Sequence, residues 1–242
     1  MIMKTALITG ANKGIGYETA KQLAKLGYYV YLGCREASLG QEAVDKLVES
    51  GLTNVESIQL DVTDPITIKE SCKAIENKSN QLDVLINNAG ILGLIPQPAS
   101  TYSVEEIRKV FDTNFFGTIR VTQAFIPLLR KSDSGRIVNV TSGLGSLTLH
   151  TDPNWQYFHF KSAGYSISKA ALNGFTIMLA FDLKDTDIKV NSIDPNYTAT
   201  DFNNHRGERT PEQSAKVIVK YATLDNNGPT GKYFNEEGEL PW

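Results

Sequence analysis

Tyrosine–lysine pairs four residues apart are the most suggestive chemical feature of this sequence. The chain contains three such pairs: Tyr17 with Lys21, Tyr157 with Lys161, and Tyr165 with Lys169. On a helix, residues four apart share a face, so an ammonium group can lie beside a phenol and stabilise its anion. Such a pair is a candidate acid–base catalyst. Because a chain with 10 tyrosines produces this spacing by chance, the surrounding sequence has to choose among the three.

The surrounding sequence favours Tyr165. Tyr17 lies just past a glycine-rich loop, where packing is the expected role, and Tyr157 lies in an irregular segment beside proline and tryptophan. Tyr165 begins a sustained apolar helical pattern and follows a predicted strand that ends near Ser142. A hydroxyl, a phenol and the Lys169 ammonium would then converge on one carbonyl oxygen.

Apolar runs of strand length alternate with helical patterns along the chain. Strands are predicted at residues 5–9, 28–33, 55–60, 82–86, 136–140 and 188–193, and near residue 233. Helices are predicted at residues 15–26, 38–49, 103–129, 165–183 and 212–222, with another beginning at the cap Asp64-Pro65. This alternation implies parallel strands with right-handed crossovers. The expected fold is α/β: a single Rossmann-type doubly wound parallel sheet with helices on both faces, in one domain over residues 1–242.

The first predicted strand runs directly into a glycine-rich loop, which reads Gly10-Ala11-Asn12-Lys13-Gly14-Ile15-Gly16. Glycines at this junction let the backbone approach a pyrophosphate, and the N-terminus of the following helix favours its negative charge. The spacing G-x-x-x-G-x-G differs from the G-x-G-x-x-G of many dinucleotide folds. A plain glycine turn is the alternative, but the position between strand and helix favours nucleotide binding.

In dinucleotide-binding folds, a residue at the end of the second strand contacts the adenosine ribose. An acidic residue there favours the free hydroxyl of NAD, whereas an arginine favours the 2′-phosphate of NADP. The chain has Arg35 followed by Glu36, and Lys13 adds a second positive charge on the same side. The sequence therefore predicts NADP(H) as the cofactor.

Two further strand ends are expected to line the cofactor. Asp61 and Val62 end the third strand and suit contact with the adenine ring, although Asp61 could also cap a turn. Asn88, Ala89 and Gly90 follow the fourth strand at the same edge of the sheet.

The motifs in this order resemble the short-chain dehydrogenase/reductase superfamily, in its NADPH-dependent carbonyl reductase branch. The resemblance covers essentially the whole chain and rests on the glycine-rich loop, Asn87-Asn-Ala-Gly90, Asn114, Ser142, Tyr165-Ser-Ile-Ser-Lys169, Gly228-Pro-Thr-Gly-Lys-Tyr-Phe-Asn and Pro241-Trp242. It implies a catalytic tetrad of Asn114, Ser142, Tyr165 and Lys169. In this tetrad Tyr165 is the general acid of ketone reduction, and Ser142 orients the carbonyl oxygen. Lys169 lowers the pKa of Tyr165 and holds the nicotinamide ribose, while Asn114 positions a water that connects Lys169 to solvent.

The segment after the sixth strand departs from the family pattern. The family commonly has Pro-Gly there, and this chain has Pro195-Asn196. Asparagine tolerates a positive φ better than most residues, so the backbone path is expected to survive while the side chain narrows the pocket near the nicotinamide. The resemblance also places Pro195, Thr198 and Thr200 against the cofactor.

A second departure is an insertion at about residues 148–160, since Tyr165 follows Ser142 by 23 positions. The insertion is expected to roof one side of the substrate pocket with Trp155, Tyr157, Phe158 and His159. Such a roof would favour a bulky or aromatic carbonyl compound, whereas an exposed loop tip is the alternative. Further pocket candidates, by position alone, are Leu144, Leu147, Tyr197 and Phe202.

Composition restricts the other functions. The net charge of −3 includes no basic patch, so neither nucleic acid nor a membrane surface is an expected partner. Two cysteines and three histidines without ligand spacing argue against a metal site, and no secretion signal or spanning segment is visible. We expect a cytoplasmic protein that is a monomer, a homodimer or a higher homo-oligomer.

The expected function is transfer of a hydride from NADPH to a ketone or aldehyde, reversible as an alcohol dehydrogenase. Two alternatives remain: an alcohol-oxidising steroid or sugar dehydrogenase, and a non-catalytic NADPH-sensing protein. The physiological substrate and the stereochemistry of the product are open at this level.

Overall fold

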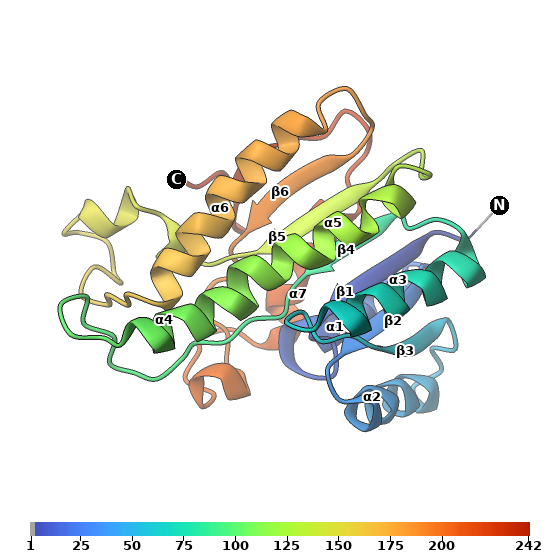
Figure 1. Cartoon of the computed structure of the whole chain (residues 1–242), viewed down its shortest axis with the longest axis horizontal. Coiled ribbons are helices and arrows are strands. Elements are labelled where there is room, and N and C mark those ends of the chain that lie inside the picture. The colour runs from blue at the N-terminus through green and yellow to red at the C-terminus, as the bar shows by residue number, and fades with distance from the viewer. Residues whose placement is uncertain (1–2) are drawn as a thin grey trace.

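The computed structural model describes residues 3–242 and is built on one sheet of seven parallel strands (Figure 1). Across the sheet the strands are β3 (Val55–Gln59), β2 (Tyr29–Cys34), β1 (Thr5–Thr9), β4 (Val84–Asn87), β5 (Arg136–Val140), β6 (Lys189–Ile193) and β7 (Lys232–Phe234). The chain reverses direction across the sheet between β1 and β4, and a ligand crevice forms beyond the carboxyl ends of the strands at such a point. The predicted fold class is confirmed.

Helices cover both faces of the sheet (Figure 1). One face is covered by α1 (Gly14–Lys25), α2 (Ala37–Glu49) and α7 (Pro211–Ala222), and the other by α3 (Pro65–Ser79), α4 (Val104–Phe111), α5 (Thr118–Leu129) and α6 (Tyr165–Asp182). Alternate residues of a strand point to opposite faces. Accordingly, Ile8 packs in the core under α1, α2 and α7, and Leu7 packs in the core under α3, α5 and α6. Burial on both faces explains why the strands read as continuous apolar runs.

The long helix predicted at residues 103–129 is not uniform. The chain forms α4, then a π-helical segment at Asp112–Gly117, then α5. At the start of α4, Ser103 Oγ accepts from the Glu106 N–H at 3.4 Å and donates to Glu105 Oε2 at 2.9 Å. A π-segment widens one turn and is frequent at functional sites. Asn114 lies inside it.

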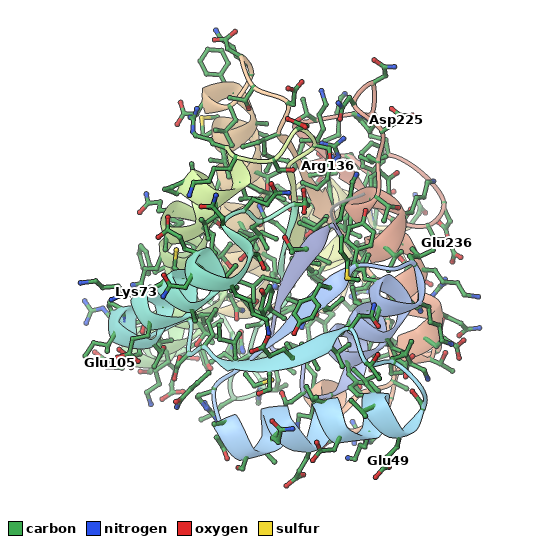
Figure 2. All side chains as sticks on the ribbon, turned by 90° about the vertical axis from the view of Figure 1, so that its right-hand side faces the viewer. Glu49, Lys73, Glu105, Arg136, Asp225 and Glu236 are labelled. Atoms are coloured by element: carbon green, nitrogen blue, oxygen red, sulfur yellow. The ribbon has the colours of Figure 1, made fainter. Side chains whose placement is uncertain are left out.

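The amino ends of the strands are held together by buried polar groups. Asp83 accepts hydrogen bonds from the Thr5 N–H at 2.7 Å and from Ser132 Oγ at 2.6 Å. Arg136, labelled in Figure 2, donates from Nε to the Leu224 carbonyl at 3.0 Å and from Nη2 to Asn226 Oδ1 at 2.7 Å. A buried charge needs such partners, so these contacts stabilise the amino ends of the strands. The carboxyl ends of the strands are left open for a site.

None of the described helices has the length and apolar character needed to cross a bilayer. Within residues 3–242, histidine, cysteine and carboxylate side chains nowhere gather in a group of three that could hold a metal ion.

Candidate active site

A cavity of about 1660 Å³ opens at the carboxyl ends of the strands. Every cofactor-binding residue predicted from the sequence lines it: Gly10, Asn12, Lys13, Gly14, Ile15, Gly16, Arg35, Asp61, Val62, Asn88, Ala89, Gly90, Tyr165, Lys169, Pro195, Thr198 and Thr200. Ser142 also lines this cavity, whereas Asn114 lies behind its wall. The volume exceeds that of a usual small-molecule pocket and suits a dinucleotide together with a second molecule.

The glycine-rich loop has the geometry of a phosphate-binding turn. Gly10 and Gly14 have φ angles of 65° and 58°, which side chains rarely adopt. A Cβ on Gly16 would lie 2.4 Å from the Gly10 carbonyl oxygen and 2.6 Å from Asn88 Nδ2, so no side chain fits there. The loop backbone therefore bounds the cavity directly at the start of α1, where an anion is favoured.

The two cations at this end of the cavity each pair with a carboxylate. Lys13 Nζ lies 2.8 Å from Asp201 Oδ2, and Arg35 Nη2 lies 3.6 Å from Glu36 Oε1. All four side chains are largely exposed, so both ion pairs are weak, and a more highly charged anion can displace the carboxylates from Lys13 and Arg35. Both cations are available to a phosphate that enters the cavity.

The ends of β3 and β4 are rigid. Asp61 Oδ1 accepts from the Thr63 N–H at 2.8 Å, so this residue caps a turn as well as lining the cavity. Asp64 caps α3 by accepting from the Ile66 N–H at 2.9 Å, as predicted. Asn88 Nδ2 donates to the carbonyls of Thr9 and Gly10 at 2.9 and 3.0 Å, which ties β4 to the glycine-rich loop.

Tyr165 and Lys169 share one face at the start of α6 and are both buried. Lys169 Nζ donates to the Val140 carbonyl at 2.8 Å and lies 5.8 Å from the centre of the Tyr165 ring. Ser142 follows β5, and its backbone carbonyl accepts a hydrogen bond of 2.5 Å from the Tyr233 hydroxyl. The hydroxyl, phenol and ammonium groups predicted to converge therefore meet at one edge of the sheet.

Burial dominates the acid–base properties of this group. Burial raises the pKa of Tyr165, and the hydrogen bond with Ser142 offsets part of that rise. Burial also lowers the pKa of Lys169 to about 8. The expected lowering of the Tyr165 pKa is thus outweighed in the free protein, because desolvation penalises the phenolate more than the nearby groups stabilise it.

Asn114 connects the π-segment to the loop after β4. Its Oδ1 accepts from the Ile91 N–H at 2.8 Å, and its Nδ2 donates to the Ile91 carbonyl at 2.9 Å and to Ser168 Oγ at 3.0 Å. A Cβ on Gly90 would lie 3.3 Å from Asn114 Oδ1 and 3.5 Å from Lys169 Nζ. The amide and the ammonium are thus neighbours across Gly90, and only a small residue allows their approach.

In the other two tyrosine–lysine pairs, the lysine or the tyrosine makes other contacts. Lys161 Nζ donates to the His150 carbonyl at 2.8 Å and lies 4.3 Å from the centre of the Phe158 ring, so it does not serve Tyr157. Tyr17 packs against the core under α1. Of the three, only the pair on α6 is buried beside a serine hydroxyl.

Sequence reasoning missed two positioning residues, Gln97 and Tyr233, and one buried carboxylate, Asp194. Gln97 Oε1 accepts from the N–H groups of Gly164 and Tyr165, each at 3.0 Å, and so caps the helix that carries Tyr165. The Tyr233 hydroxyl donates to the Ser142 backbone carbonyl, and Asp194 lines the cavity just before Pro195. The partners of Gln97 and Tyr233 are distant in sequence, so no local pattern points to them. Asp194 could have been predicted as a site residue, because it is an acidic residue at the end of a predicted apolar strand.

The backbone at Asn196 has the expected positive φ, 61°. Its N–H donates to Asp194 Oδ1 at 2.9 Å. Thr198 is buried and its hydroxyl bonds that of Ser214 at 2.6 Å, while the Thr200 methyl lies 3.4 Å from a Cβ built on Gly14. The segment after β6 thus closes over the glycine-rich loop.

The insertion reaches the cavity with some of its aromatic residues and not with others. Trp155, Tyr157 and Phe160 line the cavity, together with Leu149 and Gln156. The predicted roof residues Phe158 and His159 do not line the cavity, because their rings pack on each other instead, with centres 5.2 Å apart. Among the other candidates, Leu144, Tyr197 and Phe202 line the cavity, but Leu147 points to solvent and is 59% exposed. In Figure 1 the insertion projects past the carboxyl ends of the strands, beside the start of α6.

Comparison with known proteins agrees with this geometry. A family model described as short chain dehydrogenase matches residues 4–211. A (+)-neomenthol dehydrogenase of Capsicum annuum is 32% identical over 299 aligned positions, which cover 95% of this chain and 94% of that enzyme. The solved structure of salutaridine reductase from Papaver somniferum is 30% identical, with a TM-score of 0.84, covering 96% of this chain and 99% of that one. An NADPH-bound carbonyl reductase from chicken fatty liver is 26% identical, with a TM-score of 0.86 and full coverage of both chains. The chain belongs to the short chain dehydrogenase family.

Proposed function

We propose that this protein is an NADPH-dependent carbonyl reductase that reduces a ketone or aldehyde to an alcohol and catalyses the reverse reaction. The observation that carries this proposal is one cavity with two ends. At one end Lys13 and Arg35 follow β1 and β2, and at the other end, beyond β4, Ser142 follows β5 beside Tyr165 and Lys169 of α6. A cationic end suits the ribose phosphate of NADPH, and the polar group at the other end suits a carbonyl oxygen.

The cofactor assignment has independent support. Only glycine fits at position 16 of the loop, as a close backbone approach to a pyrophosphate requires. Among the related structures, the chicken carbonyl reductase is described as NADPH bound. When bound, the nicotinamide would supply the hydride, and this chain would hold it with the glycine-rich loop, Arg35, Lys169 and the Thr198–Thr200 segment.

The residues of the chain would handle the proton. Ser142 donates a hydrogen bond to the substrate carbonyl oxygen and orients it. Tyr165, which burial keeps protonated, donates its phenolic proton to the developing alkoxide. Lys169, with a pKa of about 8, is mostly a cation at neutral pH and stabilises the phenolate that results. Asn114 is buried beside Lys169, on the other side of Gly90. It would position a water next to the Lys169 ammonium, and this water would return a proton from solvent.

The substrate is proposed to be bulky or aromatic. Trp155, Tyr157 and Phe160 of the insertion line the cavity, as do Tyr197 and Phe202. The Phe202 ring lies 5.5 Å from that of Tyr165, so apolar aromatic surface begins next to the reacting group. Aromatic substrates would bury their surface against these rings.

Turnover by three proteins tests the proposal. Purified wild type, Tyr165→Phe and Tyr157→Phe are mixed with NADPH or NADH and a panel of bulky ketones, diketones and aldehydes, and loss of reduced cofactor is followed. We expect turnover with NADPH that falls by at least a hundredfold in Tyr165→Phe, because general acid catalysis is lost. Tyr157→Phe retains turnover. Preference for NADH with oxidation of steroid or sugar alcohols would favour the alcohol dehydrogenase alternative. NADPH binding without turnover on any substrate would favour a sensing protein.

We also propose a cytoplasmic location. Cys34 and Cys72 are both free thiols, and burial raises the pKa of each. Unpaired cysteines suit a reducing compartment, which is also where NADPH is kept reduced.

A further inference from the structure

The substrate end of the cavity contains an aromatic corner, defined here as Trp155, Tyr157 and Tyr197. The Trp155 and Tyr157 rings are 5.5 Å apart at 86°, and the Tyr157 and Tyr197 rings are 6.1 Å apart at 66°. All three side chains line the cavity. Rings at such angles bound a space from more than one direction, and each ring face carries a negative quadrupole.

A buried carboxylate borders the aromatic corner. Asp194 is 8% exposed and lines the same cavity. A Cβ on Gly143 would lie 3.1 Å from Asp194 Oδ2 and 3.6 Å from the Trp155 ring, so the carboxylate and the indole both lie within 4 Å of this point. Asp194 accepts backbone hydrogen bonds from Asn196 and Gly143, which hold the carboxylate in place but leave its charge in the cavity.

The charge balance around this point is negative. Burial raises the pKa of Asp194 to about 6, so it is mostly ionised at pH 7.5. The charges of Glu208 and Asp194 help burial to raise the pKa of Tyr157, which places both carboxylates near that ring. Glu237 also lines the cavity and acts on Asp194. The facing cation, Arg209, is paired with Glu236 and offsets Asp194 only in part.

We propose that the aromatic corner and Asp194 form a subsite for an ammonium group carried by the carbonyl substrate. Aromatic faces attract a cation through their quadrupole, and a nearby carboxylate adds a direct charge interaction. The proton transfer assigned above to Ser142, Tyr165 and Lys169 includes neither the Asp194 carboxylate nor the Trp155 ring, so we assign the subsite to substrate selection. The inference rests on the proposed reductase function and names its substrate class: ketones or aldehydes with a quaternary or protonated tertiary amine.

The test compares two aryl ketones of the same shape. One carries a trimethylammonium group on a two-carbon chain from the ring, and the other carries a tert-butyl group in its place, so they differ in a permanent charge and not in carbonyl reactivity. We expect kcat/KM with NADPH to be about tenfold higher for the charged ketone, as a desolvated cation–π contact with a carboxylate would give. Calorimetry of both ketones on the NADP⁺ complex should show the same preference in Kd.

Variants assign the preference to the subsite. Asp194→Asn, which keeps a carbonyl acceptor for the Asn196 N–H, and Trp155→Leu should each lower the ratio of the two kcat/KM values towards one. Asp182→Asn removes an exposed carboxylate at the far end of α6 and should leave the ratio unchanged. In wild type the ratio should fall as the pH drops through about 6, because Asp194 becomes neutral while the ammonium cannot titrate.

The outcomes separate this inference from the proposed function. Equal kcat/KM and equal Kd for the two ketones in wild type would overturn the subsite while leaving the reductase intact. A preference that survives in both Asp194→Asn and Trp155→Leu would overturn it as well. If neither ketone is reduced, the reductase proposal fails for this class, and the Kd values on the NADP⁺ complex still decide whether the corner binds an ammonium.

Discussion

At the scale of single residues, Arg35 is the sharpest test of cofactor choice. Its side chain is 73% exposed and has only a 3.6 Å contact with Glu36, so removing it should cost little stability. Arg35→Ala should raise the KM for NADPH by about tenfold to a hundredfold, because a charged hydrogen bond to the 2′-phosphate is lost. The KM for NADH should not change. Steady-state kinetics with both cofactors measure the difference.

Arg130→Ala is the matched control, since Arg130 is exposed just after α5, at the end remote from the cavity. It should alter neither KM. An equal rise in both KM values for Arg35→Ala would mean that Arg35 supports the fold of the loop and does not read the phosphate.

Residue types and spacing were sufficient to propose the reacting residues but not to find the residues that position them. Tyr165 could be chosen over Tyr157 because a sustained apolar helix follows it, and the structure places its lysine beside it. Gln97 could not be foreseen, since the two N–H groups that it caps lie 67 and 68 positions away along the chain. Asn114 was found only through family resemblance, because a helical asparagine carries no local signal.

At the scale of elements, the insertion is expected to set substrate scope. Replacing residues 150–160 by a short glycine–serine linker removes Trp155, Tyr157 and Phe160 from the cavity wall. The kcat/KM for bulky aromatic ketones should fall by about tenfold to a hundredfold, which corresponds to the free energy of burying one aromatic side chain. Small aliphatic ketones should be reduced at a similar rate. A substrate panel run on both proteins measures the change.

A point variant controls for disturbance of the insertion itself. His159 is exposed and does not line the cavity, so His159→Ala should leave the scope unchanged. Unaltered scope in the linker protein would show that the insertion is an exposed loop tip with no part in selection.

The strands were the most predictable elements, because short apolar and β-branched runs such as residues 28–32 favour a buried strand at that length. The π-segment at Asp112–Gly117 was not predictable. Its wider turn places Asn114 against Ile91, and a Cβ on Gly117 would lie only 2.8 Å from a Val62 methyl. These are tertiary contacts, and helical periodicity alone does not contain them.

At the scale of the whole molecule, the two ends of the strands have different roles: the carboxyl ends form the site and the amino ends stabilise the fold. The carboxyl edge carries the cavity, and the amino edge carries buried charges with full sets of partners, including Arg136 (Figure 2). Both ends belong to the same seven strands, and β1 to β6 each contribute to both cores. We therefore propose that residues 1–242 fold as one cooperative domain.

This proposal predicts that a defect at the amino edge weakens the whole molecule in one step. Arg136→Met should leave the acceptors at Leu224, Asp187 and Asn226 without their donor, at a cost of about 1–3 kcal/mol. Each kcal/mol lowers the melting temperature of a chain of this size by about 2–4 °C. Melting followed by far-ultraviolet circular dichroism and by loss of NADPH fluorescence enhancement should give one coincident transition in wild type and variant. A higher NADPH concentration should raise this transition equally for both probes by mass action, since NADPH binds only the folded cavity. Two transitions, with Arg136→Met lowering one and NADPH raising the other, would show instead that the edges belong to separate folding units.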